Sequence, residues 1–131
     1  MNDPNCIFCK IIRGDVAGRI IDRNDEVIVF LSLDNHPLVV TVDHIADIFE
    51  LGEKQSGAVM RAASRIAKAM RAALQPDGIH LAQSNGEAAG QEVFHYHVHL
   101  YPHWSHRRGL DESEAGKDRM AAELKAALAS V

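Results

Sequence analysis

The sequence contains little that would tie it to a membrane, a nucleic acid or an oxidising compartment. Two cysteines in 131 residues are far below the usage of disulfide scaffolds and predict a cytoplasmic protein. No apolar run approaches the ~20 residues of a membrane span, and the first residues lack a basic flank followed by an apolar signal core. Acidic residues outnumber basic residues by 18 to 14, which argues against broad binding to nucleic-acid phosphates.

What the chain does have is the composition of one folded domain. Hydrophobic residues make up 47% of it and charged residues 24%, which is typical of a globular protein. A chain of this length buries roughly two-thirds of its unfolded surface and needs no disulfide framework. No repeat or linker divides the sequence, so we expect a single domain over residues 1–131.

The hydrophobic pattern predicts an α+β fold. Short apolar segments bounded by turn signals predict five strands, at residues 19–22, 27–31, 38–42, 79–83 and 94–101. An alanine-rich segment with apolar residues three or four apart predicts a long helix over 53–74, and a similar spacing predicts a helix within 112–131. Residues 44–51 are expected to form a short helix or turn. Because most of the helix lies outside the run of strands, we expect an antiparallel sheet.

Histidine is concentrated near the end of the chain, where five of the eight fall within residues 95–106. Histidines alternate strictly with apolar residues here, and alternate residues of a strand point to the same face. His95, His97 and His99 are therefore predicted to share one face, with the intervening side chains in the core. Metal coordination and nucleophilic attack on phosphorus both explain this row better than a solvated face with incidental histidines.

A glycine-containing loop, Asn-Gly-Glu-Ala-Ala-Gly-Gln at residues 85–91, leads into the histidine row. Glycines let backbone N–H groups approach an anion, and Gln91 adds a side-chain amide. Taken alone, this segment is better interpreted as a plain connection. Joined to the histidine row, it indicates an anion cradle beside a nucleophile.

The row, His95-Tyr-His97-Val-His99-Leu-Tyr101, resembles the His-φ-His-φ-His-φ-φ motif of the histidine triad (HIT) family, in which φ is apolar. Three further blocks resemble other segments of that family: residues 6–14 its N-terminal segment, 36–44 its Gly-His-x-Leu-Val-x-Pro-x-x-His stretch, and 89–93 the approach to the triad. The blocks keep the family's order, so the sequence is identified by resemblance as a member.

The resemblance implies a five-stranded antiparallel sheet with one long helix and a C-terminal helix, usually paired into a homodimer. It also implies a hydrolase or nucleotidyl transferase that acts on the α-phosphate of purine nucleoside 5′-phosphoramidates or related nucleotides. His97 would attack phosphorus, His99 would contact the phosphate or the leaving group, and His36 would support the cluster. A dinucleoside polyphosphate hydrolase and a nucleotide-binding regulatory module without turnover are the alternatives.

The family's substrate-binding positions match a further set of residues. These are Phe8, Ile11, Leu31, Ser32, Leu33, Ser84, Asn85, Gln91 and Val93. For the apolar members, an ordinary core role explains the sequence equally well. The loop over residues 31–35 is shorter than is usual, so Ser32 stands where the family has a ribose-binding aspartate, and Asp34 is an alternative. Asn85 could serve for the amide that Ser84 replaces.

The pair Cys6-x-x-Cys9 has three interpretations: half of a zinc site, a redox pair, or buried apolar residues. The absence of a βαβ context disfavours the redox role. Some bacterial members of the family carry structural zinc on such a pair plus two histidines, and His44 and His95 match those histidines. The resemblance therefore implies a closed zinc site that anchors the N-terminus, with no organic cofactor. The expected partner is a small nucleotide rather than a nucleic acid or membrane.

Overall fold

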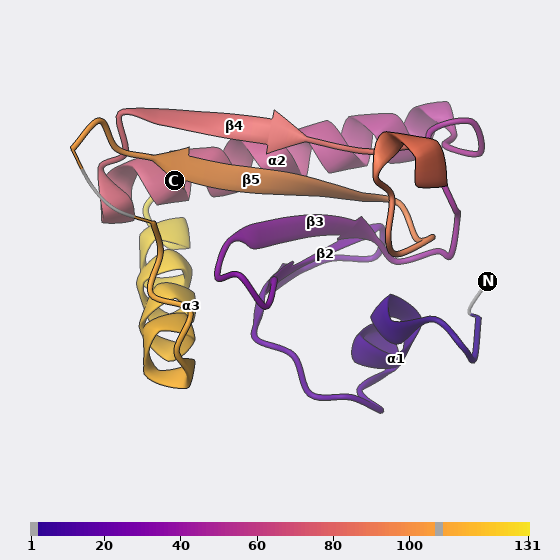
Figure 1. The fold of residues 1–131 in the computed structure, drawn as a ribbon, viewed down its shortest axis with the longest axis horizontal. Coiled ribbons are helices and arrows are strands. Elements are labelled where there is room, and N and C mark those ends of the chain that lie inside the picture. The colour runs from indigo at the N-terminus through magenta and orange to yellow at the C-terminus, as the bar shows by residue number, and fades with distance from the viewer. Residues whose placement is uncertain (1–2, 107–108) are drawn as a thin grey trace.

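The computed structural model describes residues 3–106 and 109–131, which form a five-stranded antiparallel sheet and three α-helices (Figure 1). The strand order is β1-β2-β3-β5-β4. The strands are β1 (Ile20–Arg23), β2 (Val27–Leu31), β3 (Pro37–Thr41), β4 (Gly78–Ala82) and β5 (His97–His103). The helices are α1 (Ile7–Arg13), α2 (Glu53–Leu74), α3 (Glu114–Leu128) and the single 3₁₀ turn η1 (Glu87–Ala89). The predicted α+β fold is confirmed.

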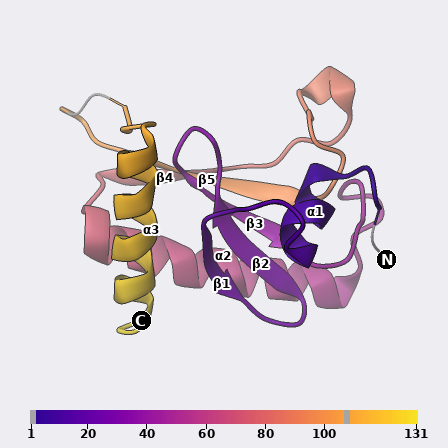
Figure 2. The ribbon, with the colours of Figure 1, turned by 90° about the horizontal axis from the view of Figure 1, so that it is seen from below.

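The central strands are buried on both faces, because helices lie on either side of them. Alternate residues of β2 and β3, including Val29 and Val39, pack in one core with α2 and α3. Their neighbours, including Phe30 and Val40, pack in a second core with α1. Figure 2 shows α1 in front of the sheet and α2 behind it. The sheet therefore has an α2 face and an α1 face.

Helix α2 follows the predicted range because its small side chains face the sheet. Ala63, Ile66 and Ala69 are fully buried, so the helix backbone can approach the strands closely. The helix ends at Gln75, which has a left-handed φ of 50°, and Pro76 cannot continue it. Across one end of the sheet lies α3, which completes the same core. Among the described residues, none of the helices is long and apolar enough to cross a membrane.

Helix α1 was not expected from the sequence. Cys6 is its N-cap, and the Sγ atom accepts a hydrogen bond from the N–H of Cys9 at 3.5 Å. Gly14 ends the helix with a φ of 87°, a conformation that glycine adopts without strain. An apolar run followed by a basic residue and then a glycine, here Arg13 and Gly14, is a C-terminal signal that could have identified this helix. The helix places Phe8 against the α1 face of the sheet.

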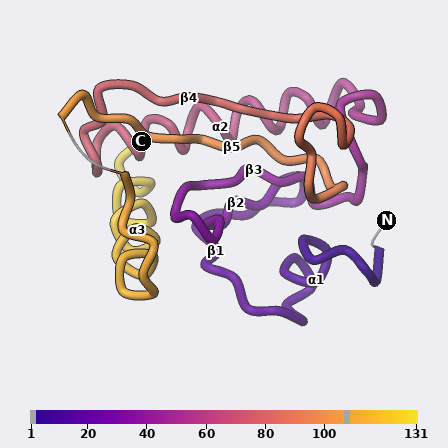
Figure 3. Tube along the Cα trace, viewed as in Figure 1, coloured from indigo at the N-terminus to yellow at the C-terminus, as the bar shows by residue number. Residues whose placement is uncertain are grey.

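Strand β5 is shifted along the chain relative to the prediction of 94–101. It begins at His97, so His95 lies just before the strand rather than within it, and it continues to His103. Pro102 is tolerated because β3 pairs with β5 only from His97 to His99, so that within the described part of the chain no strand pairs with the proline on that side. The wide connection from β4 to β5 lies at the end of the sheet near the N-terminus (Figure 3). Residues 44–51 form bends and a turn, without a helix.

Candidate functional site

The histidines of β5 lie on the α1 face of the sheet. Their strand neighbours Val98 and Leu100 are buried in the core beneath α2, as the alternation predicts. His97 and His99 therefore project from the opposite face, and their ring centroids lie 4.9 Å apart. The ring of Phe8 in α1 packs edge-on against His97, with 5.0 Å between centroids. One side of the His97 ring is thus walled by an apolar side chain.

The protonation of His97 follows from a single hydrogen bond. Its Nδ1 lies 2.6 Å from the carbonyl oxygen of His95. A carbonyl only accepts, so Nδ1 carries the proton and donates it. Burial lowers the pKa of His97, which favours the neutral ring. In this neutral ring Nε2 holds a free lone pair, which is the form that a nucleophilic imidazole requires.

A second hydrogen-bonded chain joins His99 to the loop between β2 and β3. Nδ1 of His99 lies 2.9 Å from Nε2 of His36, and Nδ1 of His36 lies 2.9 Å from the Oγ of Ser32. The same Oγ accepts the N–H of His36 at 3.2 Å. Tyr101 stacks on His99 at 7° and lies 4.2 Å from His36 between ring centroids. Ser32, expected on the ribose, is therefore engaged in holding His36.

The imidazoles of this chain are kept neutral by their surroundings. Burial, together with the neighbouring His99, lowers the pKa of His36 to about 4. Burial, together with the neighbouring His97, likewise lowers the pKa of His99 to about 4. The carboxylate of Asp34 opposes both shifts, so its charge faces this part of the site. Proton donors and acceptors here are thus neutral rings near pH 7.

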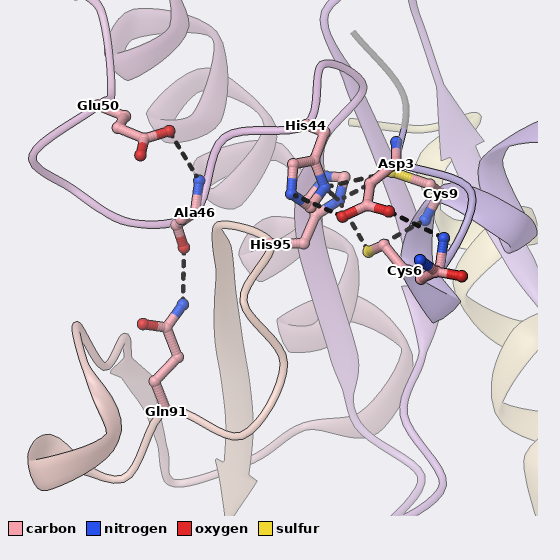
Figure 4. Close-up of polar contacts among 9 residues, drawn as sticks. Asp3, Cys6, Cys9, His44, Ala46, Glu50, Gln91 and His95 are labelled. Atoms are coloured by element: carbon pink, nitrogen blue, oxygen red, sulfur yellow. Dashed lines mark hydrogen bonds and ion pairs between the residues drawn. The ribbon is translucent and has the colours of Figure 1, made fainter.

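Four potential metal ligands converge at the other end of the histidine row (Figure 4). Cys6 and Cys9 come from the start of α1, His44 from the loop after β3, and His95 from the segment before β5. Their ligand atoms all lie within 4.8 Å of one another. The Nδ1 atoms of the two histidines are 3.2 Å apart, and each lies 3.3–3.5 Å from a cysteine sulfur. The structure brings together all four residues that the resemblance implied.

The two histidines of this group are oriented by contacts behind them. Nε2 of His95 donates to the carbonyl of Thr41 at 2.6 Å, which leaves Nδ1 with its lone pair toward the sulfurs. Nε2 of His44 lies 3.9 Å from a carboxylate oxygen of Asp3. The N–H of Asp3 donates to the Sγ of Cys9 at 3.4 Å. Such outer contacts fix the tautomer of a ligand histidine and increase its basicity.

The polar residues of the predicted anion cradle are used to hold loops together. Gln91 is buried, accepts the N–H of Gly86 at 2.7 Å and donates to the carbonyl of Ala46 at 2.6 Å, away from the cysteine–histidine group (Figure 4). The Oδ1 of Asn85 accepts the N–H of Ile48 at 2.7 Å. These bonds join the loop before β5 to the loop before α2. Positive φ angles at Gly86 and Gly90 give the first loop its shape.

The remaining predicted substrate-binding residues lie in different surroundings. Phe8 is buried against the histidines, while Ile11 and Val93 pack half-buried on the same core. Leu31 lies on the α2 face, because it alternates with Phe30 along β2, so the structure does not bring it to the histidines. Leu33 is 84% exposed in the turn after β2. Ser84 lies half-buried beside the loop bonds described above, and its carbonyl accepts from the side chain of Gln83.

Three residues that the sequence did not single out help to build the site. They are Asp3 and Thr41 behind the metal ligands and Tyr101 against the imidazole pair. Thr41 contributes its backbone carbonyl, which every residue type has, so the sequence gives no indication of this role. Tyr101 occupies the last apolar position of the triad motif, and its face could have been inferred from the strand alternation.

Comparisons of the sequence with known proteins identify a family. The HIT domain family matches residues 13–106. The protein hit of Bacillus subtilis is 37% identical over 110 residues, which cover 81% of this chain and 76% of that protein. The adenosine 5′-monophosphoramidase of Saccharomyces cerevisiae is 32% identical over 112 residues, covering 82% of this chain and 68% of the yeast protein.

Solved structures share the overall fold of this chain. A crystal structure of a zinc-bound histidine triad family protein from Mycobacterium smegmatis superimposes with a TM-score of 0.87 at 28% identity, covering 96% of this chain and 94% of that one. A HIT-like protein from Bartonella henselae gives a TM-score of 0.86 at 29% identity, covering 97% and 99% of the two chains. The fold agrees over nearly the whole length, the family model matches residues 13–106, and the chain belongs to the HIT family.

Proposed function

We propose that this protein is a nucleotide hydrolase and nucleotidyl transferase that forms a covalent intermediate on His97. The hydrogen bond from Nδ1 of His97 to the carbonyl of His95 carries this proposal, because it leaves the lone pair on Nε2. A neutral imidazole with a free nitrogen is a competent nucleophile toward phosphorus. The substrates are purine nucleoside 5′-phosphoramidates or related nucleotides.

In the first step, Nε2 of His97 forms a bond to the α-phosphorus while the bond from phosphorus to the leaving nitrogen breaks. The electron pair goes to the leaving amine, which takes up a proton from the pair of His99 and His36. Water then attacks the same phosphorus and gives a proton back to this pair, the N–P bond breaks with its electron pair returning to Nε2 of His97, and the nucleoside monophosphate leaves with the oxygen of water. The pair of His99 and His36, joined at 2.9 Å, supports proton transfer on the phosphate and leaving-group side.

The phosphoramidate class is supported by relatives of known activity. Two yeast proteins, from Saccharomyces cerevisiae and Schizosaccharomyces pombe, are adenosine 5′-monophosphoramidases with 32% and 29% identity to this chain. We assign the base pocket to the apolar α1 face beside Phe8, Ile11 and Val93.

We also propose that Cys6, Cys9, His44 and His95 hold a structural zinc ion. Zn–S bonds of about 2.3 Å and Zn–N bonds of about 2.0–2.1 Å place tetrahedral S···N pairs about 3.5 Å apart and N···N pairs about 3.3 Å apart. The distances in this site, 3.3–3.5 Å and 3.2 Å, fit that geometry. With four protein ligands, the ion supplies a cross-link rather than chemistry. Reduced thiolates are needed, which supports a cytoplasmic location.

A comparison of two substrates tests the enzymatic proposal. Wild-type protein is expected to release AMP from adenosine 5′-phosphoramidate, and His97→Ala is expected to lose this activity by several orders of magnitude. The matched control His80→Ala removes an exposed imidazole on β4 and is expected to behave as wild type. Faster cleavage of diadenosine tetraphosphate would favour the polyphosphate hydrolase. Binding of AMP without turnover of either substrate would instead indicate a regulatory module.

The second copy of a homodimer is proposed to cover the edge of the sheet at β4. Among the described strands, β4 pairs only with β5, so its outer edge has free backbone donors and acceptors. Leu81 on this strand is 42% exposed, and Met60 on α2 is also exposed. An antiparallel edge pairs readily with its own copy about a twofold axis. Leu81→Lys should give a monomeric mass by light scattering, whereas Leu33→Lys, in an exposed turn, should leave the dimer intact.

A further inference from the structure

His95 links the proposed metal site to the nucleophile, because its two ring nitrogens and its backbone carbonyl each contact a different group. Its ring is fully buried, and its Nδ1 faces Cys6 and Cys9 at 3.4 and 3.5 Å. Its Nε2 donates to the carbonyl of Thr41 at the end of β3. Its own carbonyl accepts the proton of His97 Nδ1 at 2.6 Å. The residue that offers a nitrogen to the metal therefore also supplies the group that sets the tautomer of His97.

The peptide that carries this carbonyl is also held from the loop after β3. The segment before β5 lies outside the strand ladder, which begins with the pairing of Val40 and His97. The bond from the N–H of Thr41 to the carbonyl of Tyr96 is long, at 3.4 Å. The shorter bond, at 2.7 Å, runs from the N–H of Tyr96 to the carbonyl of Ile45, which directly follows the metal ligand His44. The backbone around His95 is thus held through Ile45, the residue after His44, and through Thr41, whose carbonyl accepts from the His95 ring.

A second path runs through α1. Phe8 lies between the two cysteines in sequence, and its ring packs edge-on against both His95 and His97, with centroid distances of 5.9 and 5.0 Å. Cys6 caps this helix, whose length is under two turns. A helix this short has little stability of its own. Binding of both cysteines to one ion would hold Phe8 against the His97 ring.

We propose that metal occupancy of this site sets the tautomer and orientation of His97, so that His95 is a positioning residue for the nucleophile. Loss of the metal frees the carbonyl of His95 and the ring of Phe8, and His97 then populates the tautomer with the proton on Nε2. This inference rests on the proposed role of His97 and zinc, but it concerns the ring before any substrate binds. Removal of the metal should therefore reduce capture of phosphorus even in a folded protein.

The direct test is nitrogen NMR of protein with ¹⁵N-labelled histidines, at a pH near 8 where imidazoles are neutral. Zinc-loaded protein should show the proton of His97 on Nδ1, and protein stripped by a chelator should show mixed tautomers. The bonded pair of His36 and His99 lies outside both paths and serves as an internal control. An unchanged His97 tautomer in stripped protein would overturn the proposal.

The reciprocal test needs no stripped protein. Coupling between two sites is mutual, so the loss of the His97 side chain must weaken zinc binding by the factor with which zinc favours the Nδ1–H form. We expect His97→Ala to weaken zinc binding roughly fivefold, measured in competition with a chromophoric chelator. A change of this size corresponds to the net contribution of about one hydrogen bond. His99→Ala, on the same strand and face, should change it less than about twofold, since this ring makes no such bond. Equal zinc affinity in both variants would overturn the proposal.

The two measurements separate this inference from the proposed function. If zinc sets the tautomer but the loaded protein cleaves no nucleotide, the coupling stands and the enzymatic proposal fails. If activity falls on zinc removal while the tautomer and the affinity comparison show no coupling, the enzymatic proposal stands and the coupling fails. If stripped protein unfolds, the affinity comparison between folded variants decides.

Discussion

Acidification should destabilise this protein through His36, a buried neutral imidazole. The side chain is 2% exposed, and burial together with His99 lowers its pKa from 6.5 to about 4. Between these two values the unfolded chain binds a proton that the folded protein does not, so stability falls as the pH falls. The contribution is fully present above pH 6.5 and is lost progressively down to about pH 4. A shift of this size corresponds to about 3 kcal/mol, of which about 2 kcal/mol is lost by pH 5.

Urea unfolding followed by circular dichroism at pH 7, 6 and 5 measures this contribution. Other buried histidines also titrate, so the difference between variants isolates His36. We expect His36→Gln to lower stability at pH 7 and to lose about 2 kcal/mol less than wild type between pH 7 and 5. His80→Gln, which changes an exposed histidine, should keep the wild-type slope. Parallel pH profiles for wild type and His36→Gln would refute the neutral buried state.

Three further substitutions probe other contacts. Ser32→Ala removes the hydroxyl bonded to a buried imidazole and should cost about 1–2 kcal/mol in urea unfolding and lower the turnover rate with little change in KM; unchanged turnover would contradict its positioning role. Gly116→Ala should cost about 1–3 kcal/mol, seen as a lower Tm, because the new Cβ would clash with the carbonyl oxygen of Asp111. Leu124→Ala, at a fully buried position, should cost about 2–5 kcal/mol, whereas Leu33→Ala at the surface should stay near wild type.

The fold could be predicted largely because its hydrophobic periods are clear. Alternation through Val98 and Leu100 indicated which face of β5 enters the core, and this placed His97 and His99 together on the other face. The start of the strand was predicted too early, because alternation continues through His95 although no neighbouring strand pairs with it. Alternation of apolar and polar residues indicates which side chains are buried. Where a strand begins depends instead on how far the neighbouring strand extends, and β3 pairs with β5 only from His97 onward.

The site itself was less accessible from the sequence. Cys6 and His95 are 89 residues apart, and only the resemblance to a family grouped them before the fold did. Ser32 and Gln91 were assigned to substrate, yet both use their polar atoms within the protein. The direction of a side chain in a loop follows from the turn geometry and has no periodicity to reveal it. Leu31 lies in a strand, where the periodicity does show the side-chain direction. The alternation of β2 places it on the α2 face, away from the histidines.

The most direct test of the account is the identity of the residue that captures phosphorus. Wild-type protein mixed with adenosine 5′-phosphoramidate and quenched within milliseconds should gain the mass of one adenylyl group, and peptide mapping should locate it on His97. The adduct should be absent from His97→Ala. An adduct on any other residue, or turnover that persists without His97, would contradict the mechanism.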